Sequence, residues 1–117
     1  MEEKRRFPRL EKCLPIKLSD SEFDVLTETK NISASGAWCQ VDKPLKLMTK
    51  LEMVILIPFK KNQNKSIKKI NCSGIVVRSS PADSDSKYPY YVGIYFSDLN
   101  ERDRKTLRLY IDSFLQG

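Results

Sequence analysis

The sequence contains no histidine. Histidine is the commonest general base and metal ligand in proteins, so its absence argues against a catalytic or metal centre of the usual kinds. The sequence also has no GxxxxGK phosphate-binding loop, no nucleophile elbow and no recognisable pair of catalytic carboxylates. We therefore expect a binding protein and not an enzyme, without a metal or a cofactor.

Long apolar segments are also missing. The longest apolar run, residues 53–58, has the length of a strand and is too short to cross a membrane. The charged first residues do not have the pattern of a signal peptide, so we expect a cytoplasmic protein without a membrane span. Three cysteines at unrelated spacings argue against a disulfide framework or a zinc site. Cys13 and Cys39 are interpreted as buried or half-buried thiols in a reducing compartment.

The chain is short and basic. Its 117 residues are enough for one domain with a modest hydrophobic core. A net charge of +6 favours an anionic partner: a nucleotide, a nucleic acid, a phospholipid surface or an acidic protein. Charge alone does not choose among these classes.

Six segments have the pattern of β-strands, with alternating apolar residues or short apolar runs bounded by turn residues. In chain order they are residues 14–18, 23–30, 37–41, 51–57, 67–79 and 90–96. Short strands at close spacing favour an antiparallel barrel, because closure removes exposed edges. We therefore predict a mainly β protein, a six-stranded antiparallel barrel with a C-terminal α-helix.

The predicted helix covers residues 100–117, with Asn100 as its cap and Asp103 three residues later. Its apolar stripe follows the i, i+3, i+4, i+7 spacing and is formed by Leu107, Tyr110, Ile111 and Phe114. The barrel is predicted at residues 13–99. Residues 1–12 are charged and lack an apolar period, so we interpret them as a flexible arginine-bearing arm of the same single domain.

Two short motifs supply candidate binding residues. Residues 5–9 read Arg-Arg-Phe-Pro-Arg, so that Arg5, Arg6 and Arg9 bring three guanidinium groups together. Residues 31–36 read Asn-Ile-Ser-Ala-Ser-Gly. Arginine can fork onto the O6 and N7 acceptors of guanine, clamp phosphate and stack on bases. Because an asparagine oxygen can accept from the guanine amino group, and serine and turn N–H groups suit phosphate, the motifs indicate a small anionic ligand with guanine bases.

The two motifs resemble the RxxxR and (D/N)xSxxG signature of the PilZ domain, a bacterial receptor module for cyclic di-GMP. Arg5 and Arg9 match the first element, and Asn31, Ser33 and Gly36 match the second. The last two predicted strands and the C-terminal segment are also similar to those of the family. The resemblance thus covers nearly the whole chain and implies a cyclic di-GMP receptor.

The resemblance also implies a mechanism. The arm, with Arg6 beside the motif arginines, would be mobile in the free protein and would fold over the ligand. Asn31 and Ser33 would close the site from the barrel, and Gly36 would keep the backbone clear. The ordered arm would then present a new surface to an unidentified protein partner, in a pathway such as motility or biofilm control.

Two further residues are secondary candidates for ligand contacts. Lys4 precedes the first motif, at a position thought to influence whether relatives bind one nucleotide or an intercalated pair, and its charge favours the pair. Arg78 ends a strand whose counterpart lends a residue to the pocket in some relatives, so it is expected to stack on a base. The protein itself is expected to be a monomer or a weak dimer.

Two other interpretations stay open. One is a PilZ-like adaptor that acts through protein contacts without nucleotide. The other is a basic barrel that binds nucleic acid, which requires aromatic residues interleaved with basic ones on a sheet face. Only the tyrosines at 88, 90 and 91 form such a group, so nucleic acid is disfavoured.

Two remaining features are given structural interpretations. Lysines at 60, 61, 65, 68 and 69 stand without an acid among them. They indicate an exposed hairpin, with a docking face for an acidic partner as the functional alternative. Trp38 is expected in the core.

Overall fold

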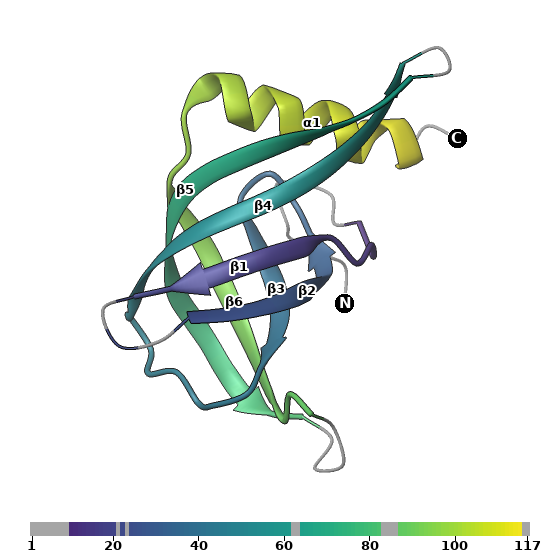
Figure 1. Cartoon of the computed structure of the whole chain (residues 1–117). Coiled ribbons are helices and arrows are strands. Elements are labelled where there is room, and N and C mark those ends of the chain that lie inside the picture. Colours follow the sequence, from purple (N-terminus) through teal and green to yellow (C-terminus); the bar gives the residue numbers. More distant parts are fainter. Residues whose placement is uncertain (1–9, 21, 23, 62–63, 83–86, 116–117) are drawn as a thin grey trace, which may run out of the picture.

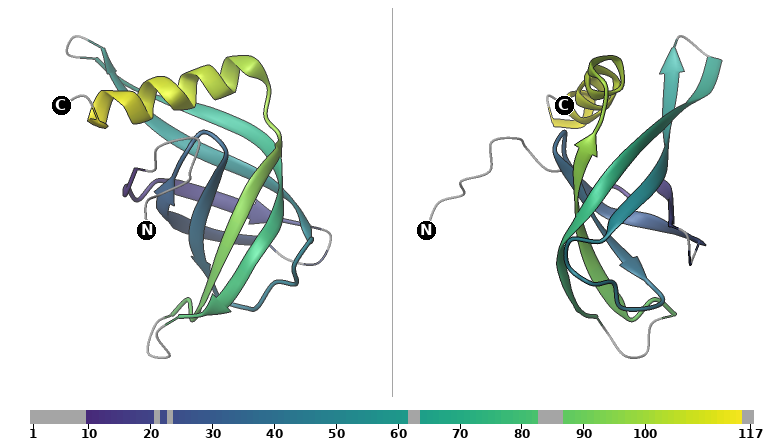
Figure 2. Two further views of the ribbon diagram at one scale, coloured as in Figure 1. Left: turned by 180° about the vertical axis from the view of Figure 1, so that it is seen from behind. Right: turned by 90° about the vertical axis from the view of Figure 1, so that its left-hand side faces the viewer.

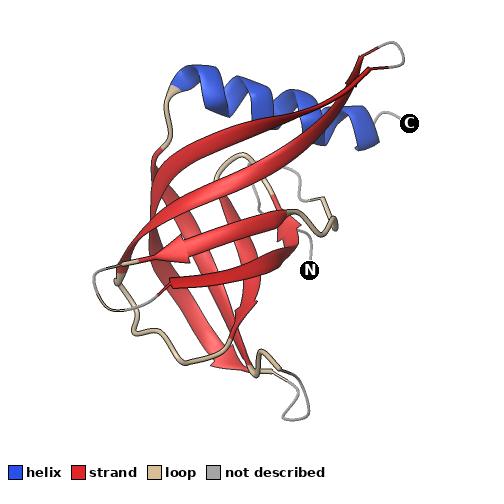
Figure 3. Ribbon diagram, viewed as in Figure 1, coloured by secondary structure: helices blue, strands red, loops and turns tan. Residues whose placement is uncertain are grey.

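The computed structural model describes residues 10–115, with gaps at positions 21, 23, 62–63 and 83–86 (Figure 1). It contains six strands and one helix, as the sequence predicted (Figure 3). They are β1 (Pro15–Ser19), β2 (Asp24–Ile32), β3 (Gly36–Val41), β4 (Lys50–Lys61), β5 (Asn64–Pro81), β6 (Tyr90–Asp98) and α1 (Glu101–Leu115).

The six strands form a closed antiparallel barrel in the order β1-β2-β3-β6-β5-β4, and β4 pairs back onto β1. Strands β4 and β5 pair with each other over a longer stretch than β4 pairs with β1 or β5 pairs with β6. Pairing of β1 with β4 ends at Ile55, and pairing of β6 with β5 begins at Ser73. Residues 56–61 and 64–69 therefore continue as a two-stranded extension, here named the lysine ribbon, which projects past α1 in Figure 2.

The barrel interior is filled by alternate apolar residues of every strand. Ile16, Ile55 and Val92 are among the fully buried side chains, and Cys39 lies with them as expected. Two expectations about burial were wrong. Cys13 is exposed, because the alternation of buried Leu14, Ile16 and Leu18 points position 13 outward. Trp38 is half-buried on the outside of β3, because Ala37 and Cys39 on either side of it face the core.

Helix α1 lies across the end of the barrel where the β2–β3 turn sits (Figure 2). The Asn100 Oδ1 atom accepts a hydrogen bond of 2.8 Å from the Asp103 N–H, which confirms the predicted cap. Leu107 and Ile111 are fully buried, whereas Phe114 at the helix end is 45% exposed. Among the described residues, no helix is long and apolar enough to span a bilayer.

The three thiols are expected to differ sharply in reactivity. Burial raises the pKa of Cys39 to about 12, and burial, with a smaller contribution from Asp103, raises the pKa of Cys72 to about 12. Because the thiolate is the reactive form, both buried groups stay protonated and inert well above neutral pH. At pH 8 a disulfide reagent should label only Cys13 in the native protein and all three cysteines in guanidinium. Labelling of either remaining thiol in native Cys13→Ser would contradict this burial.

Candidate functional site

The (D/N)xSxxG segment forms the tight turn between β2 and β3. Ser33 is 1% exposed, and its N–H donates to the Gly36 carbonyl at 2.9 Å. Its hydroxyl accepts from the Ser35 N–H at 3.2 Å and lies 3.1 Å from the Ser35 hydroxyl. The Ser33 side chain therefore organises the turn from within, and the half-buried Ser35 lies nearer the surface. Direct contact between Ser33 and a ligand stays a prediction.

Gly36 is required by the packing of β3 on β6. A Cβ atom at this position would lie 2.3 Å from the Ile94 carbonyl oxygen, a backbone atom that cannot swing away. None of the described glycines has a positive φ, so space and not backbone conformation explains the residue here. The motif glycine lets the turn approach β6 closely, where the Phe96 N–H donates to the Ser35 carbonyl at 2.9 Å.

Asn31 and Arg78 lie in one row across the outside of four strands. The register pairs Asn31 with Trp38 and Trp38 with Gly93, and Gly93 pairs with Arg78. We call Asn31, Trp38, Gly93 and Arg78 the outer row. Three inter-strand spacings of about 4.8 Å separate its two ends, roughly 14 Å in all.

Two β-bulges create this row. The register shifts between Thr29 and Asn31 on β2, and again between Val76 and Arg78 on β5. Thr29 and Val76 are fully buried, so in a regular strand Asn31 and Arg78 would point into the core. Each bulge inserts one residue and turns the next side chain outward, in line with Trp38.

The outer row has an aromatic centre. The Trp38 ring stacks on Tyr91, with ring centroids 5.6 Å apart and an angle of 14° between the planes. It also covers Gly93, where a Cβ atom would lie 2.9 Å from two of its ring atoms. Arg78 on the far side of Gly93 is exposed, and Tyr95 is 53% exposed. Flat aromatic surface beside an exposed guanidinium suits the stacking of nucleobases.

The arginine motif joins the barrel beside Asn31. Lys4, Arg5, Arg6 and Arg9 lie outside the described residues, which begin at Leu10. The Leu10 N–H donates to the Ile32 carbonyl at 2.8 Å, and the Ile32 N–H donates back to Leu10 at 2.9 Å. Leu10 is buried with Ile32 in the core. The chain that carries the arginines is therefore pinned to the strand that carries Asn31.

Thr29 fastens the next part of the same segment. Its side chain is fully buried, and its hydroxyl accepts from the Leu14 N–H at 3.0 Å and donates to the Lys12 carbonyl at 2.6 Å. The root of the arginine-bearing segment is thus held by backbone and side-chain bonds to β2. This role was not predicted, because a threonine in a strand is common and gives no signal of its own.

Arg104 is a second residue that sequence reasoning missed. From α1, its Nη1 atom donates to the Ala34 carbonyl inside the β2–β3 turn at 2.7 Å. In the sequence it is one of several basic residues in the first turns of the helix, and nothing distinguishes it from the exposed Arg102. The contact joins the helix directly to the turn that carries the second motif.

Nearly the whole sequence matches one protein family. A family model described as PilZ domain matches residues 3–113. The chain belongs to the PilZ domain family. A comparison with the curated proteins gave no match.

Solved PilZ structures show the same fold. The Bacillus subtilis inhibitor of motility MotI/DgrA superposes with a TM-score of 0.82 at 18% identity, covering 98% of this chain and 53% of that one. The PilZ domain of Escherichia coli YcgR, solved with c-di-GMP, gives 0.67 at 12% identity, with 97% and 93% covered. The K. pneumonia MrkH–c-di-GMP complex gives 0.71 at 17% identity, with 98% and 54% covered. This PilZ domain thus spans about half the length of MotI and MrkH.

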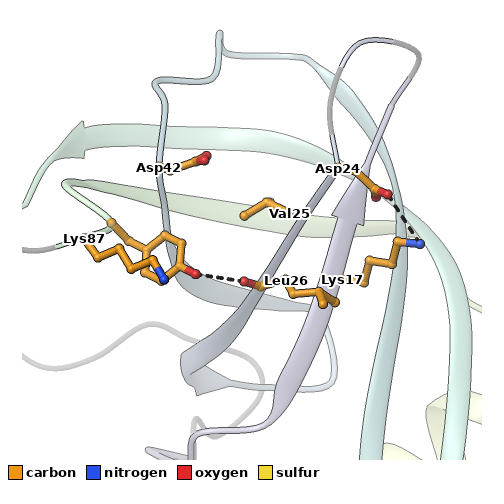
Figure 4. A pocket seen from close by; sticks show the side chains of 7 residues that line it. Lys17, Asp24, Val25, Leu26, Asp42 and Lys87 are labelled. Atoms are coloured by element: carbon orange, nitrogen blue, oxygen red, sulfur yellow. Dashed lines mark hydrogen bonds and ion pairs between the residues drawn. The ribbon is translucent and has the colours of Figure 1, made fainter.

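A separate pocket lies at the opposite end of β2 and β3 (Figure 4). Its volume is about 540 Å³, and it is lined by Lys17, Asp24, Val25, Leu26, Asp42, Lys87 and Tyr88. The Lys17 ammonium lies 3.6 Å from the Asp24 carboxylate, and Tyr88 donates to the Leu26 carbonyl at 3.3 Å. Two lysines balance two aspartates, so the pocket has no excess positive charge to attract a doubly anionic nucleotide.

Proposed function

We propose that this PilZ domain is a receptor for cyclic di-GMP and signals through its arginine-bearing arm to a protein partner. The observation that carries the proposal is the backbone pairing of Leu10 with Ile32. It ties Leu10, the residue that follows the RxxxR motif in sequence, to the strand that carries Asn31, which supports one ligand contacted by both motifs. The family match and the c-di-GMP present in the YcgR and MrkH structures support the choice of ligand.

The proposed contacts divide between the arm and the barrel. Arg5 and Arg9, with Arg6 beside them, bind the phosphates and the guanine O6 and N7 atoms. Asn31 reads a guanine edge from the outer row. Arg78 and Trp38 offer stacking surface at the centre and far end of that row. Lys4 adds charge that favours an intercalated pair of nucleotides.

The signal has two routes to α1. The Arg104 bond to Ala34 connects the helix to the turn. The Lys12 ammonium lies 4.4 Å from the centre of the Phe114 ring and connects the root of the arm to the last turn of the helix. A ligand that orders the arm and tightens the turn therefore acts on both ends of α1. The partner is proposed to read the arm and α1 together.

Titration calorimetry with cyclic di-GMP, GMP and a short oligonucleotide tests the proposed ligand. We expect strong heat only with cyclic di-GMP, and the stoichiometry distinguishes one nucleotide from a pair. The emission of Trp38, the single tryptophan, gives an independent readout at the outer row. Binding of the oligonucleotide without cyclic di-GMP would contradict the proposal and favour a nucleic-acid barrel.

Asn31→Ala is expected to weaken cyclic di-GMP binding and to relax the preference for guanine over adenine. The amide would otherwise pair with the base edge, and losing a hydrogen bond that reads a base costs about 1–3 kcal/mol of discrimination. The measurement is the ratio of affinities for cyclic di-GMP and cyclic di-AMP. Asn71→Ala, an exposed asparagine on β5 outside the row, is the matched control. An unchanged ratio in Asn31→Ala would remove the base-reading role.

A further inference from the structure

The positive charge of the chain is concentrated in one stretch. Residues 56–69 contain five lysines and neither aspartate nor glutamate. The rest of the chain has 16 basic and 15 acidic residues and is nearly neutral. Almost all of the net charge of +6 therefore belongs to a single element, and that element lies outside the outer row and the β2–β3 turn.

This element is the lysine ribbon. Each of its strands has only the other as its neighbour, because β1 stops pairing at Ile55 and β6 starts at Ser73. The ribbon projects from the barrel, and in the left view of Figure 2 it extends beyond the C-terminal half of α1. A projecting charged element can meet a surface before the rest of the molecule does.

One face of the ribbon packs against α1, and the other face is exposed. On one face Phe59 packs edge-on against Tyr110 of α1, with ring centroids 6.3 Å apart, and the Lys68 ammonium lies 5.6 Å from the Phe59 ring. On the other face the register places Pro58 opposite Ile67, and Ile67 is 68% exposed. A surface hollow of about 660 Å³ lies against this part of the ribbon and is lined from both faces, by Pro58, Phe59, Lys65, Ser66 and Ile67.

The lysines are grouped by their position along the ribbon and not by face. Lys65 and Lys69 flank Ile67 on its own face, whereas Lys68 lies on the side of α1. Lysine side chains are long and flexible, so an extended anionic surface that meets the projecting end of the ribbon can draw charge from both faces. Exposed aliphatic carbon between lysines suits the boundary between headgroups and acyl chains.

Nucleic acid fits the ribbon less well. Residues 56–69 contain no arginine, the residue that forks onto phosphates and bases. Their one aromatic ring, Phe59, packs on Tyr110 and is not free to stack on bases. We propose that the lysine ribbon docks this protein on a bilayer surface rich in anionic lipid, a function separate from nucleotide binding.

Vesicle sedimentation of the full chain, without cyclic di-GMP, tests this docking. The probes are vesicles of phosphatidylcholine alone and with 30% phosphatidylglycerol, a composition chosen for the assay as roughly one anionic lipid in three. Each lysine contributes roughly fivefold to partitioning onto an anionic surface, so Lys65→Glu/Lys69→Glu should bind at least about 25-fold more weakly than wild type. Binding should also fall at high salt. Ile67→Ser should weaken it further at fixed charge.

The matched control is Lys46→Glu/Lys50→Glu. It makes the same change in net charge at two exposed lysines, at the other end of β4 from the ribbon. The control should partition within threefold of wild type, and both double variants should keep their circular dichroism spectra and cyclic di-GMP affinity. Equal losses in the two variants, or no wild-type binding to the anionic vesicles, would overturn the proposal. Preference for a DNA duplex or an acidic peptide over the vesicles would overturn it as well.

Discussion

Arg9→Ala is expected to lose nearly all affinity for cyclic di-GMP, and Arg5→Ala a large part of it, with neither variant unfolding. Arg9 is the motif arginine closest in sequence to Leu10, and Leu10 is paired with Ile32 beside Asn31. A lost charged bidentate contact is worth about 1–3 kcal/mol, or roughly 10- to 100-fold in affinity. Titration calorimetry against cyclic di-GMP measures both effects.

The matched control is Arg102→Ala. Arg102 is exposed on α1, so its removal makes the same change in charge away from the turn. It should bind cyclic di-GMP within about twofold of wild type, as expected when only a distant surface charge is lost. If Arg5→Ala and Arg9→Ala both bind like wild type, the assignment of the site to the first motif is wrong.

Gly36→Val is expected to damage the barrel itself, and with it ligand binding. A Cβ atom at Gly36 would sit 2.3 Å from the Ile94 carbonyl oxygen, and the next contacts are also backbone atoms of β6. Relief requires β3 and β6 to separate, which breaks the ladder that places Trp38 on Gly93. Overpacking of this kind costs about 1–3 kcal/mol or more of unfolding free energy. The urea midpoint measures the loss.

Ser35→Ala is the control in the same turn. It tests whether any substitution in this turn lowers the stability of the protein, or only one that adds a side chain at Gly36. Ser35 is half-buried, and its backbone keeps the bond to Phe96 whatever the side chain. Its midpoint should therefore shift far less than that of Gly36→Val. A Gly36→Val protein as stable as wild type would show that β3 and β6 do not approach as closely as described.

The elements could be predicted because their patterns are local. Alternating apolar residues mark the strands, the i, i+3, i+4, i+7 stripe marks α1, and Asn100 marks its start. The ribbon was underestimated: the predicted strands 51–57 and 67–79 became Lys50–Lys61 and Asn64–Pro81. Its lysine-rich residues have no apolar period, so only their pairing with each other identifies them as strands.

The site geometry could not be predicted, because it depends on register. The bulges before Asn31 and Arg78 each reverse the side on which the following residues point, and an alternating pattern does not mark a single inserted residue. Trp38 was assigned to the core as a large aromatic residue, but the regular alternation of β3, with Ala37 and Cys39 in the core, points it outward. The bond from Arg104 to Ala34 joins residues 70 positions apart and has no local signal.

Amide hydrogen exchange with and without cyclic di-GMP tests the central claim most directly. At saturation we expect new protection at residues 4–9 and in the turn at 33–36, with little change in residues 51–57 and 90–96. The Leu10 amide, already bonded to Ile32, should be protected in both states, and Arg9→Ala should show no new protection. Residues 4–9 that are protected before ligand is added, or that still exchange freely at saturation, would contradict a receptor that signals by ordering its arm.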